Sequence, residues 1–241
     1  GSLVDHSTGS VLASALADWA GSATHYRFSS PGAVERTEEV TWRGHAAAVA
    51  RFLHGLTAID NAPLAGRLEL TPVGHRVVHG GEFSQAVRVT PEVQARIELL
   101  AELAPLHNPP SLETLTAAQS ILPNVAHIAV FDTAFHATLP PAARTYPVPQ
   151  AWTEQWGIRR FGFHGLSHAY CAERAAELLQ RSPTDLRLVI CHLGHGCSAS
   201  AVLGGRCIDT TMGFTPLEGL MMGTRSGSVE PGVNLHVQQR H

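Results

Sequence analysis

The spacing of apolar positions predicts short strands and amphipathic helices along the whole chain. Apolar residues at 3–4 and 11–16 flank a polar turn, a pattern typical of a β-hairpin. Two weaker strands are expected at 24–28 and 34–40, and alanines and leucines at helical spacing predict a helix from about residue 44. The opening part of the chain is therefore expected to be mainly strand, with one helix at its end.

The middle of the chain alternates between strand and helix patterns. Residues 73–78 predict a strand, and residues 90–92 read as a helix start, with a cap hydroxyl, a proline and an acid in order. Asn108 is expected to cap a second helix. Residues 125–131 are nearly all apolar, which is typical of a strand in a covered, parallel sheet. This alternation predicts an α/β fold.

The last third combines a helix with a run of short strands. Four prolines within 140–149 indicate a domain boundary or a crossover. Ser167 is expected to cap the helix that follows it. Apolar runs at 186–193, 198–202 and 206–208, separated by glycine turns, predict a β-meander.

Residues 209–230 form a long stretch rich in Gly, Thr and Met. It is too rich in glycine for a helix and too irregular for a strand. Its six large apolar side chains need burial, which argues against disorder. We expect a folded loop that presents Arg225 to an anion. The alternative is an ordinary surface arginine in a glycine-rich turn, and the stretch alone does not separate the two.

Several polar residues stand where ligands are commonly bound. Alternation places Arg76 and Val78 on one strand face, which suits a small acid with an alkyl tail; the alternative is an arginine in a surface ion pair. Asp132 follows an apolar strand, where α/β proteins place ligand contacts, or else caps the next turn. His107 lies beside a helix N-terminus, which favours anions. The turn at 194–196 offers backbone N–H groups to phosphates, although tight turns use glycine anyway.

Composition and charge narrow the class of protein. The chain has 241 residues, of which 44% are hydrophobic and 15% charged, so it can bury a core. The formal net charge is -3 with no basic run, which argues against nucleic-acid and membrane-surface partners. No apolar stretch is long enough to span a bilayer. The four cysteines contain no CxxC pair and are expected to be reduced thiols of a cytoplasmic protein.

Six stretches in this order resemble the acetate kinase family of ATP-dependent acyl kinases. They are GHRVVHGGE (74–82), LAPLHNPP (103–110), FDTAFH (131–136), RRFGFHGLSH (159–168), HLGHG (192–196) and the block at 209–225. The resemblance implies a two-domain, actin/hexokinase-like α/β fold with a ribonuclease-H-like sheet in each half. An N-terminal domain at 1–149 and an incomplete second domain at 150–241 are expected.

The resemblance also implies a reaction. Members of the family move the γ-phosphoryl group of ATP to a short-chain carboxylate such as acetate, giving an acyl phosphate, and catalyse the reverse. ATP or ADP, Mg²⁺ and the carboxylate or acyl phosphate are the implied ligands, and a cytoplasmic homodimer is the implied form. The sequence does not distinguish acetate, propionate and butyrate.

Roles are carried over by position from the resemblance. Arg76 is expected to hold the carboxylate or phosphoryl group, His164 and Arg225 to stabilise the transition state, and Asp132 to lie near the acceptor with His107 nearby. The implied lining of the alkyl pocket is Val78, Leu106, Phe163 and Pro216. The implied phosphate-side loop for the nucleotide is His192, Leu193, Gly194, His195 and Gly196. No residue is assigned to a metal.

Departures from the family pattern leave two alternatives. The N-terminal phosphate and magnesium loop and the adenosine pocket are not in the sequence, so the chain is expected to be truncated at both ends. His195 also replaces the usual asparagine. The chain is accordingly either part of an active kinase or a catalytically silent fragment. A separate reading places zinc on His164 and His168, together with His192 or His195, as in a hydrolase.

Overall fold

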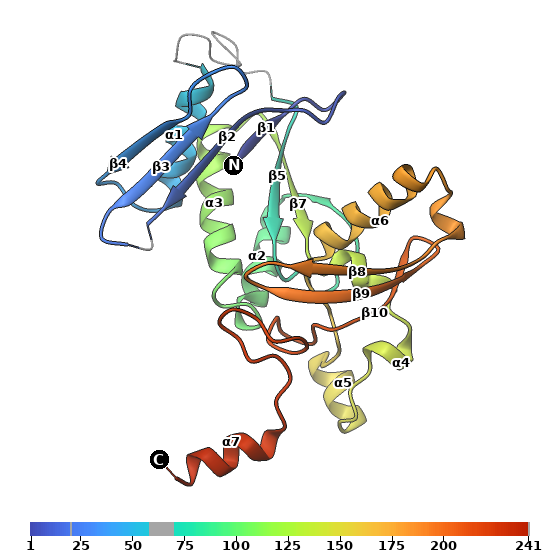
Figure 1. Cartoon of the computed structure of the whole chain (residues 1–241). Helices are drawn as coiled ribbons and strands as arrows, with labels where there is room; N and C mark the ends of the chain where they lie inside the picture. Colours follow the sequence, from blue (N-terminus) through green and yellow to red (C-terminus); the bar gives the residue numbers. More distant parts are fainter. Residues whose placement is uncertain (20, 58–69, 241) are drawn as a thin grey trace. The chain divides into compact units, whose positions relative to one another are not determined.

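The computed structural model describes residues 1–19, 21–57 and 70–240 (Figure 1). The chain divides into two compact units. Unit 1 consists of Gly1–Val73 and Pro110–His127, and unit 2 consists of Gly74–Pro109 and Ile128–His241. These bounds differ from the expected halves at 1–149 and 150–241, and that division stays a prediction.

Unit 1 contains the predicted hairpin as part of a four-stranded antiparallel sheet. Its strands follow the chain order β1 (Ser2–Val4), β2 (Val11–Asp18), β3 (Thr24–Ser29) and β4 (Arg36–Val40). All four strands were expected from the apolar pattern, with bounds that differ by a few residues.

The core of unit 1 lies between this sheet and helix α1 (His45–Thr57). Ala13, Tyr26 and Phe28 from the sheet pack with Leu56 from the helix. Gly55 also lies against the sheet, because a Cβ at that position would stand 2.8 Å from the ring of Phe28. This glycine weakens the helix end in isolation but lets the ring approach the helix backbone.

The first sheet of unit 2 has the order β5 (Pro72–Val77), β7 (Ala126–Phe131), β6 (Val87–Arg88). β7 pairs antiparallel with β6 and runs in the same direction as β5 in Figure 1. The expected parallel arrangement is therefore correct for β5 and β7, whereas β6 and β7 are antiparallel. The two-residue β6 is too short to give a periodic signal, so the sequence did not predict it.

Two helices lie between β6 and β7 in the chain, the first in unit 2 and the second mostly in unit 1. α2 (Pro91–Leu99) begins as predicted, with the Thr90 side chain accepting a hydrogen bond from Val93 N at 3.3 Å, and η1 (Leu100–Glu102) extends it. α3 (Asn108–Ile121) starts at Asn108, and the cap expected at this residue stays a prediction. The buried amide of Asn108 accepts from His79 N and donates to His79 O, both at 3.1 Å. The amide thus fixes the chain just after β5.

Short helical elements connect β7 to the second half of unit 2. They are η2 (Ala134–Thr138), α4 (Pro141–Arg144) and α5 (Gln150–Trp156). The proline-rich segment therefore holds one short helix and a connection. The longer helix α6 (Gly165–Leu179) comes next and lies beside β8 (Figure 1).

The predicted β-meander closes the described fold. After η3 (Pro183–Asp185), the strands β8 (Arg187–Leu193), β9 (Cys197–Leu203) and β10 (Arg206–Thr210) pair antiparallel in the order β10-β9-β8. No helix or strand is assigned between β10 and α7 (Pro231–Gln238), as expected for a loop.

The burial expected for this loop is only partly correct. Met212 and Met222 are buried and Phe214 packs against their cluster. Three other apolar side chains are exposed, namely Leu217, Leu220 and Met221.

Candidate functional site

Arg76 and Asp132 form a two-pronged ion pair at the ends of neighbouring strands. Arg76 Nε donates to Asp132 Oδ1 at 3.0 Å, and Nη2 donates to Oδ2 at 2.6 Å. The Asp132 side chain is 1% exposed and that of Arg76 is 58% exposed. The hydrogen bonds to Asp132 raise the pKa of Arg76. The alternative given for Arg76, an ion pair, is therefore present. The buried carboxylate of Asp132 orients the guanidinium of Arg76, whose outer edge faces solvent.

The start of α6 is fixed against Asp132. The N–H of Gly165 donates to the carbonyl oxygen of Asp132 at 2.9 Å, and a Cβ on Gly165 would stand 2.1 Å from that oxygen. Only glycine fits this contact. His164 precedes the helix with a left-handed φ of 59°, a conformation that few non-glycine residues adopt. The backbone thus places the His164 imidazole beside the Arg76–Asp132 pair.

The predicted cap at Ser167 is wrong. Ser167 lies inside the first turn of α6, and His164 occupies the N-cap position without a side-chain cap bond. The Ser167 hydroxyl lies 2.9 Å from Nδ1 of His192 instead. The serine therefore orients a histidine from the neighbouring strand β8.

His164 is held as a neutral imidazole between two partners. Its Nδ1 lies 2.8 Å from the Ser198 hydroxyl, and its ring stacks on that of His192 with centroids 4.0 Å apart. Burial, and next the proximity of His192, lower the pKa of His164 to about 4. At neutral pH the ring therefore acts as a hydrogen-bond donor or acceptor and carries no charge.

The turn at 194–196 brings His164 and Arg225 together. A Cβ on Gly196 would lie 2.8 Å from Nη2 of Arg225 and 2.9 Å from Nε2 of His164, so both groups face one point above this glycine. The turn is closed by Gly194 N–H donating to Gly196 O at 3.0 Å. Arg225 is held from its other side, where Nη1 donates to Pro216 O at 2.5 Å.

Arg160 holds the loop that carries Arg225. Its Nη1 lies 3.2 Å from each of three carbonyl oxygens, those of Thr210, Thr211 and Met212, and its Nη2 donates to Glu218 at 2.9 Å. Glu218 also accepts from the hydroxyl of Tyr146. One guanidinium thus bonds both the start of the loop and a carboxylate further along it.

An apolar cluster adjoins the charged groups. It contains Val78, Phe161, Phe163, Met212 and Met222, with Phe214 and Cys197 packed against it. Two of the four residues predicted to line an alkyl pocket, Val78 and Phe163, therefore lie in one cluster.

The other predicted residues have varied surroundings. Pro216 is half-buried and bonded to Arg225 through its carbonyl. Leu106 is 82% exposed and outside the cluster. His107 is half-buried just before α3. Their roles in substrate binding stay predictions.

The predicted nucleotide loop consists of the last two residues of β8, His192 and Leu193, and the turn that leads to β9. His192 is half-buried, while Leu193, Gly194 and His195 are exposed. The carbonyl of His195 accepts from Gly223 N–H at 3.2 Å, which connects this turn to the loop of Arg225. A contact of these residues with ATP stays a prediction.

Sequence reasoning missed two residues of this site, Ser198 and Arg160. Ser198 had a detectable signal, because alternation places it and Ser200 on the same strand face as the apolar Val202. Hydroxyls on a buried strand face indicate an internal polar network. Arg160 had no such signal, because its carbonyl partners lie about fifty residues away along the chain.

The buried histidines predict a loss of stability in mild acid. Burial is the main cause that lowers the pKa of each of the following to about 4: His79, His136, His164 and His168. Between about pH 6.5 and about pH 4 the unfolded chain then binds more protons than the folded chain. The free energy of unfolding should therefore be highest above about pH 6.5 and fall as the pH drops, by up to about 1.4 kcal/mol per pH unit for each histidine.

Urea unfolding between about pH 7 and about pH 5 measures this effect, since ordinary carboxyl groups titrate mostly below that window. The variant His168→Gln should give a shallower pH dependence, and the variant of an exposed histidine, His236→Gln, should retain that of the wild type. A free energy of unfolding that stays constant across the window would contradict the prediction.

The zinc alternative finds no support in the arrangement of the histidines. Across residues 1–19, 21–57 and 70–240, no group of three or more His, Cys, Asp or Glu side chains is placed to hold a metal ion. His164 and His168 instead share the Ser198 hydroxyl.

Across the same described segments, no helix has the length and apolarity needed to cross a bilayer.

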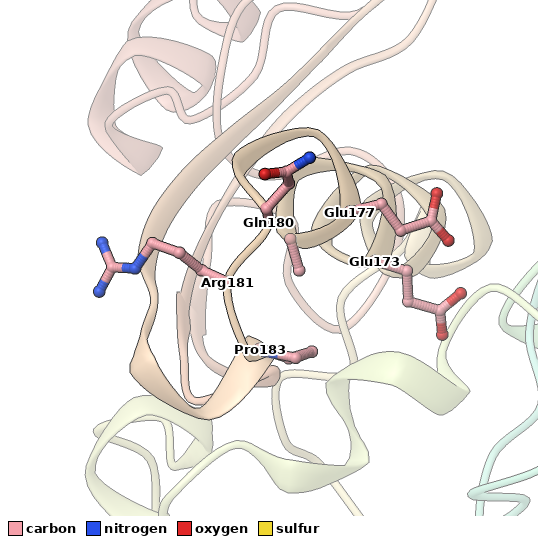
Figure 2. A pocket seen from close by; sticks show the side chains of 6 residues that line it. Glu173, Glu177, Gln180, Arg181 and Pro183 are labelled. Carbon is pink, nitrogen blue, oxygen red and sulfur yellow. The ribbon is translucent and has the colours of Figure 1, made fainter.

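A separate open hollow of about 390 Å³ lies near the C-terminal end of α6 (Figure 2). Its lining includes Glu173, Glu177, Gln180, Arg181 and Pro183. In Figure 2 the carboxylates of Glu173 and Glu177 point to one side and the guanidinium of Arg181 points to the opposite side. The hollow contains no predicted site residue, and we assign it no role in the candidate site.

Curated proteins with similar sequences are acetate kinases. An acetate kinase of Gloeobacter violaceus is 57% identical over 193 residues, which are 79% of this chain and 47% of that protein. One of Microcystis aeruginosa is 54% identical over 196 residues, or 81% of this chain and 49% of that protein. This chain spans about half the length of these curated relatives.

Solved structures of an acetate kinase and a propionate kinase share the fold of this chain. The crystal structure of Porphyromonas gingivalis acetate kinase superimposes with a TM-score of 0.89 at 38% identity, covering 99% of this chain and 60% of that one. A propionate kinase from Francisella tularensis gives a TM-score of 0.88 at 34% identity, with the same two coverages.

The class of protein follows from the fold, which is the actin/hexokinase-like α/β fold of acetate and propionate kinases. The family follows from the sequence, because the model of the Acetokinase family matches residues 1–241. The chain belongs to that family.

Proposed function

We propose that this chain carries the acceptor side and phosphoryl-binding groups of a kinase that transfers the γ-phosphoryl group of ATP to a short-chain carboxylate such as acetate, and catalyses the reverse. The convergence of His164 and Arg225 on one point above Gly196 is the main support. Because Gly165 also ties His164 to Asp132, the partner of Arg76, cationic and donor groups meet in one region.

The chemistry needs charge and orientation more than proton transfer. A carboxylate oxygen of the acceptor attacks the γ-phosphorus, a new O–P bond forms, and the bond to the β–γ bridging oxygen breaks so that ADP leaves with the electron pair. The acceptor is already ionised at neutral pH, so no general base is required. Positive charge and hydrogen-bond donors on the transferring group supply most of the catalysis.

Each charged or polar side chain receives a role on this basis. Arg76 binds the acceptor carboxylate or the phosphoryl group, and the buried Asp132 keeps its guanidinium oriented. His164 and Arg225 donate to the equatorial phosphoryl oxygens. His107 lies beside the acceptor.

The remaining predicted residues complete the binding sites. Val78, Leu106, Phe163 and Pro216 contact the alkyl group, where each methylene of acetate, propionate or butyrate is worth about 0.8 kcal/mol of burial. The turn of His192, Leu193, Gly194, His195 and Gly196 lies on the phosphate side of the nucleotide.

Mg²⁺ accompanies ATP in this proposal and would neutralise phosphate charge. Proteins usually hold it through one or two carboxylates, phosphates and water. Both oxygens of Asp132 are engaged by Arg76, and we assign no described residue to the ion. By resemblance to the family, the active form is a homodimer in the cytoplasm.

Trapping acyl phosphate with hydroxylamine tests the function. We would incubate this chain with Mg-ATP and acetate or propionate, beside a version extended to the full length of a curated relative. Product in either sample supports the proposal. Product formed by the chain without the extension also removes the silent-fragment alternative. Absence of product from both, with intact folding by circular dichroism, would contradict the proposal.

A further inference from the structure

A buried serine hydroxyl connects two histidines beneath the candidate site. Ser198 on β9 is 0% exposed. Its Oγ lies 2.8 Å from Nδ1 of His164 and 2.8 Å from Nε2 of His168. A hydroxyl donates one hydrogen bond and accepts others, so its orientation determines which ring nitrogen of each histidine carries the proton.

The surroundings of His168 restrict the possible arrangements. His168 is fully buried, and within the described part of the chain its Nδ1 has no hydrogen-bond partner. Burial lowers the pKa of both His164 and His168 to about 4, so each ring is neutral at pH 7 and carries a single N–H.

Three arrangements of the protons are chemically possible. If Ser198 donates to His168 Nε2, the proton of His168 sits on Nδ1, where it is a buried donor without an acceptor. If both rings donate to Ser198, the hydroxyl hydrogen has no acceptor. If His168 donates to Ser198 and Ser198 donates to His164 Nδ1, only a lone pair on His168 stays unpaired. Unpaired buried donors are the rarer and costlier defect, so the third arrangement is favoured.

We propose that Ser198 is a positioning residue that fixes the tautomer of His164, so that its Nε2–H points toward the space it shares with Arg225 above Gly196. The relay runs from His168 through Ser198 to His164. The benefit of this relay for phosphoryl transfer rests on the proposed function. The tautomer of His164 does not depend on that function.

The consequence for an anionic ligand is direct. In this tautomer His164 offers a neutral donor to a phosphoryl oxygen, on the side where Arg225 Nη2 also lies. In the opposite tautomer the same nitrogen would present a lone pair to that oxygen, and the contact would be repulsive. The stack with His192, itself bonded to Ser167, holds the ring in its plane.

The tautomer is measured by NMR on this chain labelled with ¹⁵N-histidine. The shifts of the two ring nitrogens show which one is protonated, and the His164→Gln spectrum assigns the His164 signals among the 15 histidines. We expect the proton on Nε2 in the wild type and a mixture of both tautomers in Ser198→Ala. Ser200→Ala is the matched control, because this buried hydroxyl on the same strand bonds Thr210. A wild-type proton on Nδ1, or an unchanged tautomer in Ser198→Ala, would overturn the proposal.

A kinetic measurement in an active, extended version addresses the benefit for the reaction. Ser198→Ala should lower kcat about 10- to 100-fold, as loss of an orienting partner does elsewhere, with little change in KM for the carboxylate. Ser198→Thr keeps the hydroxyl and should retain most of the activity. A kcat equal to that of the wild type, despite a mixed tautomer, would refute the catalytic benefit. If the wild type itself is inactive, the proposed function fails and the NMR result alone decides the tautomer.

Discussion

Arg225→Ala is expected to lower kcat for acyl phosphate formation by about 10³-fold or more in an active version that carries this chain. Arginines that stabilise a transferring phosphoryl group contribute on this scale. Arg225 is suited to the role, because Pro216 O fixes one end of its guanidinium while Nη2 faces the space above Gly196. The loss should appear in kcat, because Arg225 interacts most strongly with the equatorial phosphoryl oxygens in the transition state.

Two further variants make this prediction specific. Arg225→Lys keeps the charge and loses the planar fork, so it should recover only part of the lost activity. Arg206→Ala removes an exposed arginine from the neighbouring strand β10 and should leave kcat unchanged. Steady-state rates of hydroxamate formation distinguish the cases. A loss confined to KM would mean that Arg225 binds only the ground state of the substrate.

The sequence predicted the elements of this fold better than the contacts between them. Periodicity located the meander β8–β10 and the strand β7, because both depend on local alternation of apolar residues. The helix start at Ser167 was wrong for a physical reason. A serine before an apolar run is the usual cap signal, but Gly165 begins the helix earlier by bonding the carbonyl of Asp132. That contact joins residues distant in the chain, and no local pattern reveals it.

Asn108 illustrates the same limit. The sequence predicts Asn108 as a helix cap, but it gives no sign that the buried amide of Asn108 also bonds the backbone of His79. The pairing of Arg76 with Asp132 was equally out of reach of strand patterns, which placed each residue but gave no distance between them. The family resemblance predicted that these residues form one site. The local sequence pattern alone predicted an α/β fold and gave each residue as a separate candidate for ligand binding.

Gly196→Ala should lower kcat by roughly 10²-fold, because small displacements of catalytic groups cost about that much. The added methyl would stand 2.8 Å from Arg225 Nη2 and 2.9 Å from the His164 ring, closer than carbon atoms pack without movement. The imidazole is held by Ser198 and by its stack on His192, so the end of the Arg225 side chain is the part that must move. The substitution thus displaces a guanidinium without removing any charge.

Gly194→Ala provides a matched control within the same turn. A methyl at this position would meet its nearest atoms at 3.5 and 3.6 Å, which is ordinary contact, and neither glycine has a left-handed backbone. Both variants should therefore fold with similar thermal unfolding midpoints, while Gly196→Ala should lose much more turnover than Gly194→Ala, whose methyl group displaces neither Arg225 nor His164. Equal kcat values for the two variants would show that the space above Gly196 is not where the reacting phosphoryl group is bound.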